Sequence, residues 1–586
     1  MFELRYEILL QKSWKGSRKI DMANLSQIKR EKMIAFLEKL KEQHNDDQSL
    51  IALNQIEKEL TGKKYGLVWE AHEEAVNVML QENIPVFSED VDKEIVSDLN
   101  NNYNFLLEGD NLHSLKLLER THKGKIDVIY IDPPYNTGNK DFIYGDQYVE
   151  SVDGYRHSKW ISFMNERLSI ANRLLTKNGV IMISIDDYEQ VNLQLLCNEI
   201  FGEDSHVATC IWQRKTGASD AKGIATITEY VLIYCKNKDK AEWNEIFNKN
   251  KESYDEKRYR YSDEYESTRG KYYPDNLDRG GLRYSDSLNY AITCPDGTKT
   301  WPNGRLEFEN DGWTWKWGKE KLEWGIKEGF IEFRKSSTKP SGWAVCYKNY
   351  MFVDNEGQPI DRAAPYKNLI LNILNASASK EMKEIFDGKV FNNPKPLDLV
   401  KFLLGLVKKN DIVLDFFAGS GTTGQAVLEL NRDDNGDRKF ILCTNNENRI
   451  CENVTYNRLK TVILGKRTDG SMYSEGISAN LKYYKTDFVN KHSTELVDKL
   501  LEHVREMIQL QFAISINNKK YVIIEDDEQM DDFENSYHSI NGLEAVFINQ
   551  DVLLSASQER LISEINTYVI PDCYFDFELR EAGELW

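Results

Sequence analysis

Short apolar runs alternate with amphipathic stretches from Tyr103 onward, and this alternation restricts the folds open to the chain more than any other feature. The runs NFLLEGD, IDVIYIDPPY and GVIMISIDD have the length of strands, and stretches such as residues 160–175 have helical spacing. Strands of a parallel sheet are continuously apolar because helices cover both of its faces. The pattern therefore predicts an α/β fold with a doubly wound parallel sheet.

A long irregular segment interrupts this pattern. Residues 216–388 are aromatic and punctuated by glycine, and they hold seven of the twelve tryptophans. The α/β rhythm resumes at DIVLDFFAGSGTTGQAVLEL, so this segment is predicted to be inserted between two halves of one sheet. The predicted domains are an N-terminal helical region (1–95), one half of the sheet (96–215), the inserted domain (216–388), the other half (389–470) and a C-terminal α+β domain (471–586).

The two ends of the chain are less regular than its middle. Near the start, residues at helical spacing support the helical region: Ile28, Met33, Phe36, Leu37 and Leu40. Toward the end, the acidic run 525–534 is predicted to be a solvated loop.

Charge and cysteine content limit the functional classes. The formal net charge of −20 opposes binding of a polyanion unless the contacting surface is local. Residues 216–388 hold 27 Lys and Arg against 28 Asp and Glu, so the acidity lies mainly elsewhere. The eight cysteines form no CxxC pair and no zinc-like cluster, which predicts a cytoplasmic protein with reduced thiols and no structural metal. We expect neither a signal peptide in residues 1–19 nor a membrane span.

The motif Asp132-Pro133-Pro134-Tyr135 follows the apolar run 126–131. Ligands of open α/β sheets bind at the carboxyl ends of strands. The two prolines fix the turn and remove backbone donors, which leaves carbonyl acceptors. An exocyclic amine has two hydrogens to donate, which Asp132 and the Pro133 carbonyl can accept while Tyr135 stacks on a flipped-out base. A rigid turn after a buried strand is the alternative interpretation.

A second motif, DFFAGSGTT at 415–423, follows the apolar run IVL and opens a helix. Gly419 and Gly421 let a ligand approach the backbone at a helix N-terminus, where free N–H groups favour an anionic group. The motif lacks the third glycine of a dinucleotide fingerprint and the Gly-Lys-Ser/Thr of a P-loop, so a ligand without pyrophosphate is implied. A tight turn between strand and helix is the alternative.

In this order, DPPYNTG and DFFAGSGTT resemble the beta-class DNA amino-methyltransferases, in which the catalytic motif precedes the S-adenosylmethionine motif. LEGDNLHSL, HSKWISFMNERL, FNNPKPLDLV and ENVTYNRLK are similar too, and with KYGLVWE the closest likeness is to modification subunits of Type III restriction systems. The resemblance spans about residues 50–490. It implies a Rossmann-like methyltransferase sheet with circularly permuted motif order and an inserted target-recognition domain.

The resemblance also implies the reaction and its participants. S-adenosylmethionine is the expected cofactor, double-stranded DNA the expected substrate and N6 of a flipped-out adenine the expected acceptor. An Asp at the head of the catalytic motif, here Asp132, is typical of adenine-modifying members, whereas cytosine-N4 enzymes usually have Ser. A homodimer and a separate ATP-dependent restriction subunit are the implied partners, and the chain itself has no Walker A pattern.

The resemblance assigns roles to individual residues. Asp132, Pro133, Pro134 and Tyr135 match the catalytic motif. The residues predicted to bind the cofactor are Asp110, Asp132, Asp415, Phe417, Ala418, Gly419, Gly421, Thr422, Glu447, Asn393, Lys395 and Pro396.

Simple local roles compete with several of these assignments. Asp110 would also cap the end of a strand, and Asn445 and Asn446 compete with Glu447 for the ribose hydroxyls. A helix start would explain the segment 393–396 as well as closure over the methionine end of the cofactor does.

Basic residues among tyrosines and tryptophans in the inserted domain predict DNA contacts. The residues predicted to make them are Arg269, Lys271, Arg283, Lys335 and Lys339. The alternative is that the aromatic residues form the core of a small domain and the charges its solvated surface.

Other functions remain open at this point. The chain resembles a modification subunit, but a solitary adenine methyltransferase would have the same motifs. A methyltransferase of the same fold acting on cytosine N4, an RNA base or a protein glutamine is a further alternative. A catalytically silent subunit that only recognises DNA is the alternative from a different functional class.

Overall fold

The computed structural model describes most of the chain from Glu74 onward. The described residues are 74–98, 102–138, 141–144, 147–150, 153–217, 223–250, 255–281, 284–360, 362–386, 388–516, 520–540 and 542–582, with Leu37, Leu40, Lys41, Leu53 and Trp69. The chain divides into two compact units, 1–71 and 72–586, and the fold below is that of the second. The predicted N-terminal helices, the KYGLVWE segment and Arg283 therefore lie almost entirely outside the described residues.

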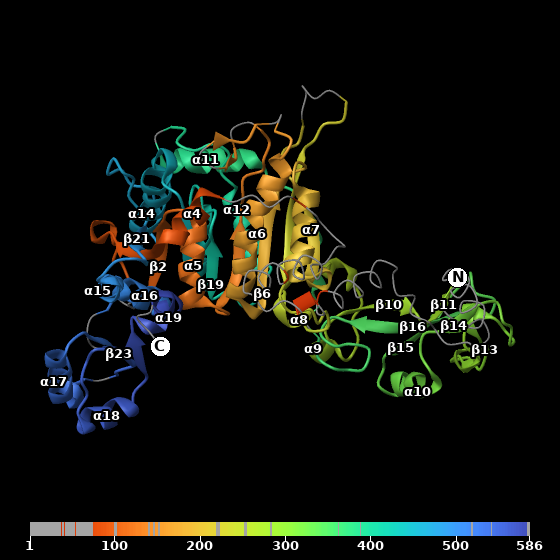
Figure 1. The fold of residues 1–586 in the computed structure, drawn as a ribbon. Helices are drawn as coiled ribbons and strands as arrows, with labels where there is room; N and C mark the ends of the chain where they lie inside the picture. The colour runs from red at the N-terminus through yellow and green to blue at the C-terminus, as the bar shows by residue number, and fades with distance from the viewer. Residues whose placement is uncertain are drawn as a thin grey trace, which may run out of the picture. The chain divides into compact units, whose positions relative to one another are not determined.

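Within the described part of the chain, ten strands form one mixed sheet (Figure 1). Their order across the sheet is β1 (Asn83–Glu89), β21 (Asn480–Asn490), β2 (Tyr103–Glu108), β20 (Lys439–Thr444), β19 (Ile412–Asp415), β3 (Ile126–Ile131), β6 (Leu175–Ile185), β8 (Thr228–Cys235), β7 (His206–Gln213) and β18 (Leu369–Ile370). The pairs from β21 to β6 are parallel, and β1 and β8 run antiparallel to their neighbours.

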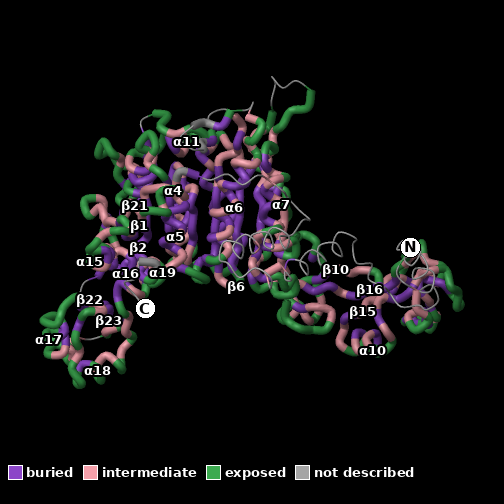
Figure 2. Tube along the Cα trace, viewed as in Figure 1, coloured by how far each residue is buried: buried purple, intermediate pink, exposed green. Residues whose placement is uncertain are grey.

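Helices cover both faces of this sheet, which confirms the predicted doubly wound α/β fold. Figure 1 shows helices packed on the sheet. On one face, Val128 and Tyr130 of β3 pack in one hydrophobic core with residues of the second helix layer. The two layers consist of α5 (Asn111–His122), α6 (Arg156–Leu174) and α7 (Gln190–Phe201), and of α12 (Leu397–Gly405), α13 (Thr422–Asp434) and α14 (Asn457–Leu464). Figure 2 shows buried residues along the strands of the sheet and exposed residues on the loops around it.

The sheet extends beyond the two halves that the sequence predicted. β1 lies in the region predicted to be helical, and this part of the prediction is wrong. Its apolar residues Ile84, Val86 and Phe87 are buried, and Pro85 is tolerated because β1 is an edge strand. β21 lies beyond residue 470, and β8 and β18 lie within the predicted insertion. These three strands belong to the central sheet and not to the neighbouring domains in which they were predicted.

The inserted domain is shorter than the predicted 216–388, because it lies between two short paired strands. β9 (Lys249–Asn250) pairs with β17 (Ala364–Pro365), so the chain leaves and rejoins the sheet region at one place. Between them, β10 (Tyr272–Asn276), β16 (Trp343–Tyr350) and β15 (Ile331–Lys335) form an antiparallel sheet. The other elements are β11 (Asp278–Gly280), β14 (Trp313–Trp315), β12 (Ile292–Thr293), β13 (Lys299–Thr300), α9 (Glu266–Arg269) and α10 (Lys319–Lys327). This segment has its own aromatic core, which includes Trp315, Trp317 and Tyr350.

A small parallel sheet lies near the end of the chain. It contains β22 (Tyr521–Ile524), β23 (Ala545–Asn549) and β24 (Thr567–Ile570), with α17 (Asp527–Ser536), α18 (Ala556–Ser563) and α19 (Asp572–Ala582). The loop predicted over 525–534 is wrong, because α17 occupies most of it. Asp526 caps this helix by accepting from the backbone N–H of Gln529, and Met530 and Phe533 are buried on its inner face.

The remaining elements connect these parts. They are α4 (Ala75–Glu82), β4 (Ile143–Tyr144), β5 (Gln147–Tyr148), α8 (Trp243–Ile246), α11 (Asn375–Ile385), α15 (Leu496–Leu501) and α16 (Val504–Phe512). Among the described residues, none of the helices combines the length and apolar character needed to cross a membrane.

Candidate functional site

The loop after β3 carries the predicted catalytic motif. β3 pairs in parallel with β19, so Asp132 and Asp415 emerge at the same edge of the sheet, where ligands of such sheets bind. The Pro134 carbonyl accepts a 2.7 Å hydrogen bond from the indole Nε1 of Trp160, which fixes the turn. Asn136 adopts a left-handed φ of 57° and donates to Glu189 Oε1 at 2.5 Å. The motif is therefore held rigidly at its end as well as by its prolines.

Asp132 and Tyr135 belong to a partly buried polar network. The Tyr135 hydroxyl donates to Asp132 Oδ1 at 2.9 Å and to Glu229 Oε2 at 3.1 Å, and these two bonds are alternatives for one proton. Lys395 Nζ lies 3.1 Å from Asp132 Oδ1 and 3.0 Å from Glu229 Oε2, and it also donates to the Tyr135 hydroxyl. Arg214 lies 3.3 Å from Glu229 Oε1. Two carboxylates and one ammonium thus contact the Tyr135 hydroxyl, and Arg214 pairs with the other oxygen of Glu229.

Burial and charge act in opposite directions on this network. Burial raises the pKa of Asp132, and the Glu229 charge adds to this, whereas the Lys395 ammonium lowers it. For Lys395, burial alone would lower the pKa, but the carboxylates of Asp132 and Glu229 raise it overall. The lysine is therefore a protonated counterion of both acids.

The glycine-rich motif forms a tight turn between β19 and α13. Asp415 is buried, and its carboxylate accepts from the Phe417 backbone N–H at 2.9 Å and from the Thr423 hydroxyl at 2.5 Å. Burial raises the pKa of Asp415 to about 7, against the effect of these two donors. Asp415 thus holds the turn from beneath.

Gly419 and Gly421 both have left-handed backbones, with φ of 48° and 78°. A Cβ at Gly419 would lie 3.2 Å from the ring of Phe391, and one at Gly421 would lie 3.1 Å from the Thr455 side chain. Side chains at these positions would crowd Phe391 and Thr455 next to the start of α13. The turn therefore fits a ligand that needs a close approach to backbone N–H groups at a helix N-terminus.

Lys395 joins the two loops. Its backbone carbonyl accepts from the Thr422 hydroxyl at 3.4 Å, while its ammonium lies in the network around Asp132. Pro396 occupies the N-cap position of α12, and Asn393 is exposed with a φ of 53°. The predicted helix start is therefore present, and closure of this segment over the methionine end of the cofactor stays a prediction.

Asp110 caps the start of helix α5, rather than the end of a strand as the local alternative predicted, by accepting from the Leu112 backbone N–H at 2.8 Å. Its carboxylate also lies 3.5 Å from the buried guanidinium of Arg167. Arg167 donates to Asn111, whose amide donates to the Phe416 carbonyl at 2.8 Å. Asp110 is therefore tied to the strand end that carries the glycine-rich turn.

Glu447 is exposed beyond the end of β20, as is Asn445. Asn446 instead donates to Glu108 Oε1 at 2.8 Å, at the end of the neighbouring strand β2. Asn446 thus links the end of β20 to the end of β2.

A family model described as DNA methylase (N6_N4_Mtase) matches residues 126–456, from the start of β3 to the residues before α14. The chain belongs to this family. The match confirms the resemblance to DNA amino-methyltransferases that the two motifs predicted.

Two curated relatives of this DNA methylase are modification subunits. The StyLTI Mod subunit of a Type III restriction-modification enzyme from Salmonella typhimurium (strain LT2) is 33% identical over 65% of this chain and 59% of its own length. The EcoPI Mod subunit of Escherichia phage P1 is 31% identical over 67% of this chain and 65% of its own length. The methylase thus spans about three fifths of the length of these relatives.

Solved structures resemble the methylase more distantly. The PvuII DNA methyltransferase, which is cytosine-N4-specific, is 13% identical, with a TM-score of 0.28 over 58% of this chain and 82% of its own.

Sequence reasoning missed Glu229, Arg214 and Trp212 of the methylase site. Glu229 is the second residue of β8 in the run TITEYVLIYC, and an acid inside an otherwise apolar run was the available signal. Because β8 is antiparallel to β6, its first residues lie at the same edge as the ends of β3 and β19. Arg214 follows the end of β7, and Lys395 lies 5.7 Å from the Trp212 ring.

The predicted DNA contacts divide into two groups. Arg269 stacks on Tyr265 at 3.8 Å and donates to the Glu328 carbonyl, and Lys339 pairs with buried Asp278 at 2.8 Å. Both side chains are engaged by partners within the inserted domain, whereas the structural alternative placed the charges on its solvated surface. Lys271 is exposed. Lys335 is 70% exposed, and it also pairs with Asp296 at 3.3 Å and lies 3.7 Å from the Trp343 ring.

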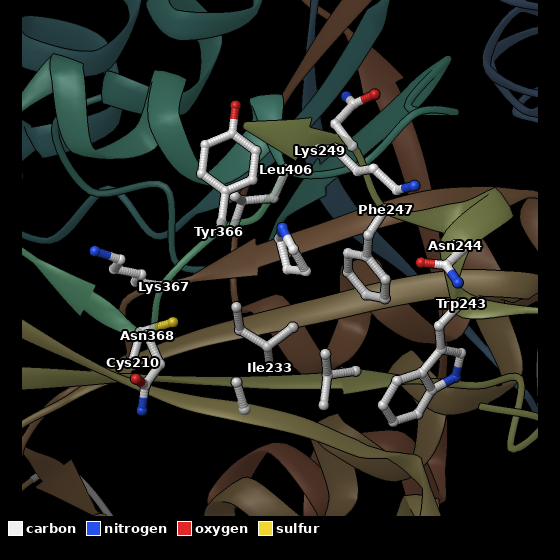
Figure 3. A pocket seen from close by; sticks show the side chains of 14 residues that line it. Cys210, Ile233, Trp243, Asn244, Phe247, Lys249, Tyr366, Lys367, Asn368 and Leu406 are labelled. Atoms are coloured by element: carbon white, nitrogen blue, oxygen red, sulfur yellow. The ribbon is translucent and has the colours of Figure 1, made fainter. Parts of the chain in front are cut away.

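A cavity of about 210 Å³ lies away from this site. Figure 3 shows Trp243, Phe247 and Tyr366 around it, with Ile233 on its floor. It includes Val207 at the start of β7, whereas Arg214 follows the end of that strand. None of the predicted site residues of the methylase lines it.

Proposed function

We propose that this DNA methylase transfers a methyl group from S-adenosylmethionine to N6 of an adenine flipped out of double-stranded DNA. The observation that carries the proposal is the juxtaposition of two strand ends, with Asp132 and Tyr135 after β3 and the Gly419/Gly421 turn after β19. Bound S-adenosylmethionine supplies an electrophilic methyl group on a sulfonium. The chain's own contribution is then alignment and electrostatics.

The residues divide this work between the two loops. The backbone of the glycine-rich turn and the N-terminus of α13 hold the cofactor, with Phe417 beside it. Asp132 and the Pro133 carbonyl accept the two hydrogens of the adenine amine, which favours lone-pair density on nitrogen. The Tyr135 ring, fixed through its hydroxyl by Asp132 and Lys395, stacks on the base. Asp132 also lies where it can accept the proton that the methylated amine releases.

We further propose that the protein is the modification and sequence-recognition subunit of a Type III restriction-modification system. Its similarity to the StyLTI and EcoPI Mod subunits supports this, although it spans about three fifths of their length. In that role it acts in the cytoplasm as a homodimer with a separate ATP-dependent restriction subunit. The inserted domain reads the DNA sequence, with exposed Lys271 and Lys335 as phosphate contacts.

The reaction is tested by incubating the protein with unmethylated genomic DNA and labelled S-adenosylmethionine, followed by digestion to nucleosides. We expect label in N6-methyladenine, and none when Asp132→Ala replaces the wild type. Label in N4-methylcytosine would instead show that N4 of cytosine is the acceptor. No labelled nucleoside, with intact cofactor binding, would support a silent recognition subunit instead.

A further inference from the structure

Glu229 is a buried acid that neither motif of the methylase includes. Its side chain is 8% exposed and has a cation on each oxygen, with Arg214 3.3 Å from Oε1 and Lys395 3.0 Å from Oε2. A carboxylate is costly to bury, and the pairing with two cations offsets much of that cost. A buried acid at the edge of the sheet where the substrate base is expected therefore suggests a functional role for Glu229.

The contacts of the Asp132 carboxylate indicate what this role is. Lys395 and the Tyr135 hydroxyl both contact the same oxygen, Oδ1, at 3.1 and 2.9 Å. Both contacts are to Oδ1, no hydrogen bond to Oδ2 is found among the described residues, and the side chain is 27% exposed. An amine hydrogen of the substrate can be accepted there without displacing the lysine.

We propose that Glu229 is a positioning residue for methyl transfer, which holds Lys395 between two carboxylates so that Asp132 keeps one oxygen for the target amine. This inference rests on the proposed function. Without the Glu229 charge, the ammonium of Lys395 has Asp132 as its remaining carboxylate and moves toward both of its oxygens. The acceptor is then occupied by the protein's own cation.

The proposal predicts a direction for the pH dependence, because Asp132 must be ionised to accept the amine hydrogen. Removing the Glu229 charge removes a repulsion that raises the pKa of Asp132, so the variant should stay ionised to lower pH. Removing Lys395 should have the opposite effect. The charged and titratable groups around Asp132 and Glu229 are Tyr130 on β3, Tyr135, Lys395, Arg214, Asp186 after β6 and Asp415 on β19.

The test compares Glu229→Gln and Lys395→Met with the wild type in single-turnover methyl transfer across pH, with cofactor affinity measured by calorimetry. For Glu229→Gln we expect a rate at least about tenfold lower, cofactor affinity within about twofold of wild type, and an acid limb shifted to lower pH. For Lys395→Met we expect an acid limb shifted to higher pH. Glu199→Gln, an exposed acid on α7, is the matched control and should behave as wild type.

The outcomes separate this inference from the proposed function. A wild type that transfers no methyl group to DNA would refute the proposed function. An active wild type with an unchanged rate in Glu229→Gln, or with its acid limb unmoved or raised, would overturn the positioning role alone. Should Glu229→Gln fail to fold, Lys395→Met still decides, because an unmoved or lowered acid limb in that variant contradicts the shared-lysine arrangement.

Discussion

Replacing Gly421 with alanine tests the cofactor turn most directly. Gly421 precedes α13 with a φ of 78°, and its new Cβ would lie 3.1 Å from the Thr455 side chain. Thr455 in turn donates a 2.6 Å hydrogen bond to the Gly419 carbonyl. The substitution therefore strains the backbone at residue 421 and displaces Thr455, which holds the other glycine of the turn, Gly419.

The left-handed backbone sets the size of the effect. It costs an L residue roughly 1–2 kcal/mol, and the close contact with Thr455 adds to this. If the turn relaxes to relieve the strain, its N–H groups leave their positions, and this energy appears as a loss of cofactor affinity of about 5- to 30-fold. If the turn does not relax, the same energy appears as a loss of stability.

Calorimetric titration with S-adenosylmethionine and thermal unfolding together measure both effects. Gly124→Ala is the matched control, because Gly124 has a φ of 68°, no atom within 4 Å of its new Cβ, and a place in the turn between α5 and β3. The control should lose stability but keep its affinity. Wild-type affinity and stability in Gly421→Ala would refute the reasoning.

Three further predictions concern the acids and the inserted domain. Asp132→Asn should lower the methyl-transfer rate about 100-fold or more with cofactor affinity retained, as measured by single turnover and calorimetry; a near-normal rate would contradict its role. Asp415 has a folded pKa of about 7 against an ordinary value of 3.8, so its stabilising contribution is complete below pH 4 and declines as pH rises to 7. The thermal stability deficit of Asp415→Asn relative to wild type should therefore narrow over that range, and a constant or widening deficit would count against it. Lys271→Ala should reduce the slope of log DNA affinity against log salt by about one, whereas Lys339→Ala should leave Asp278 unpaired and destabilise the protein by roughly 3 kcal/mol; the reverse pattern would exchange their roles.

The two catalytic strands could be predicted because their apolar runs end in residues with restricted backbones. The runs before Asp132 and Asp415 are buried on both faces, and the prolines and glycines after them mark the turns. Their meeting at one edge followed from the parallel order of an α/β sheet. Sequence pattern was sufficient here because local and long-range preferences agree.

Glu229 could not be placed in this way. Its position depends on β8 running antiparallel to β6, and the direction of a strand is a property of the whole sheet rather than of its residues. Arg269 and Lys339 show a similar limit, because the same basic residue among aromatic side chains can stack inside a domain or face DNA. Only the partners within reach distinguish the two cases.

The pairing of β9 with β17 has a consequence for how specificity can diversify. Because both crossings between the sheet and the inserted domain lie side by side, replacing the stretch between β9 and β17 would disturb the sheet region at one place only. The ends of β3 and β19 carry no residue from that stretch. On the proposed function, in which the inserted domain reads the DNA sequence, new target sequences would arise by exchange of this domain while the residues after β3 and β19 stay the same.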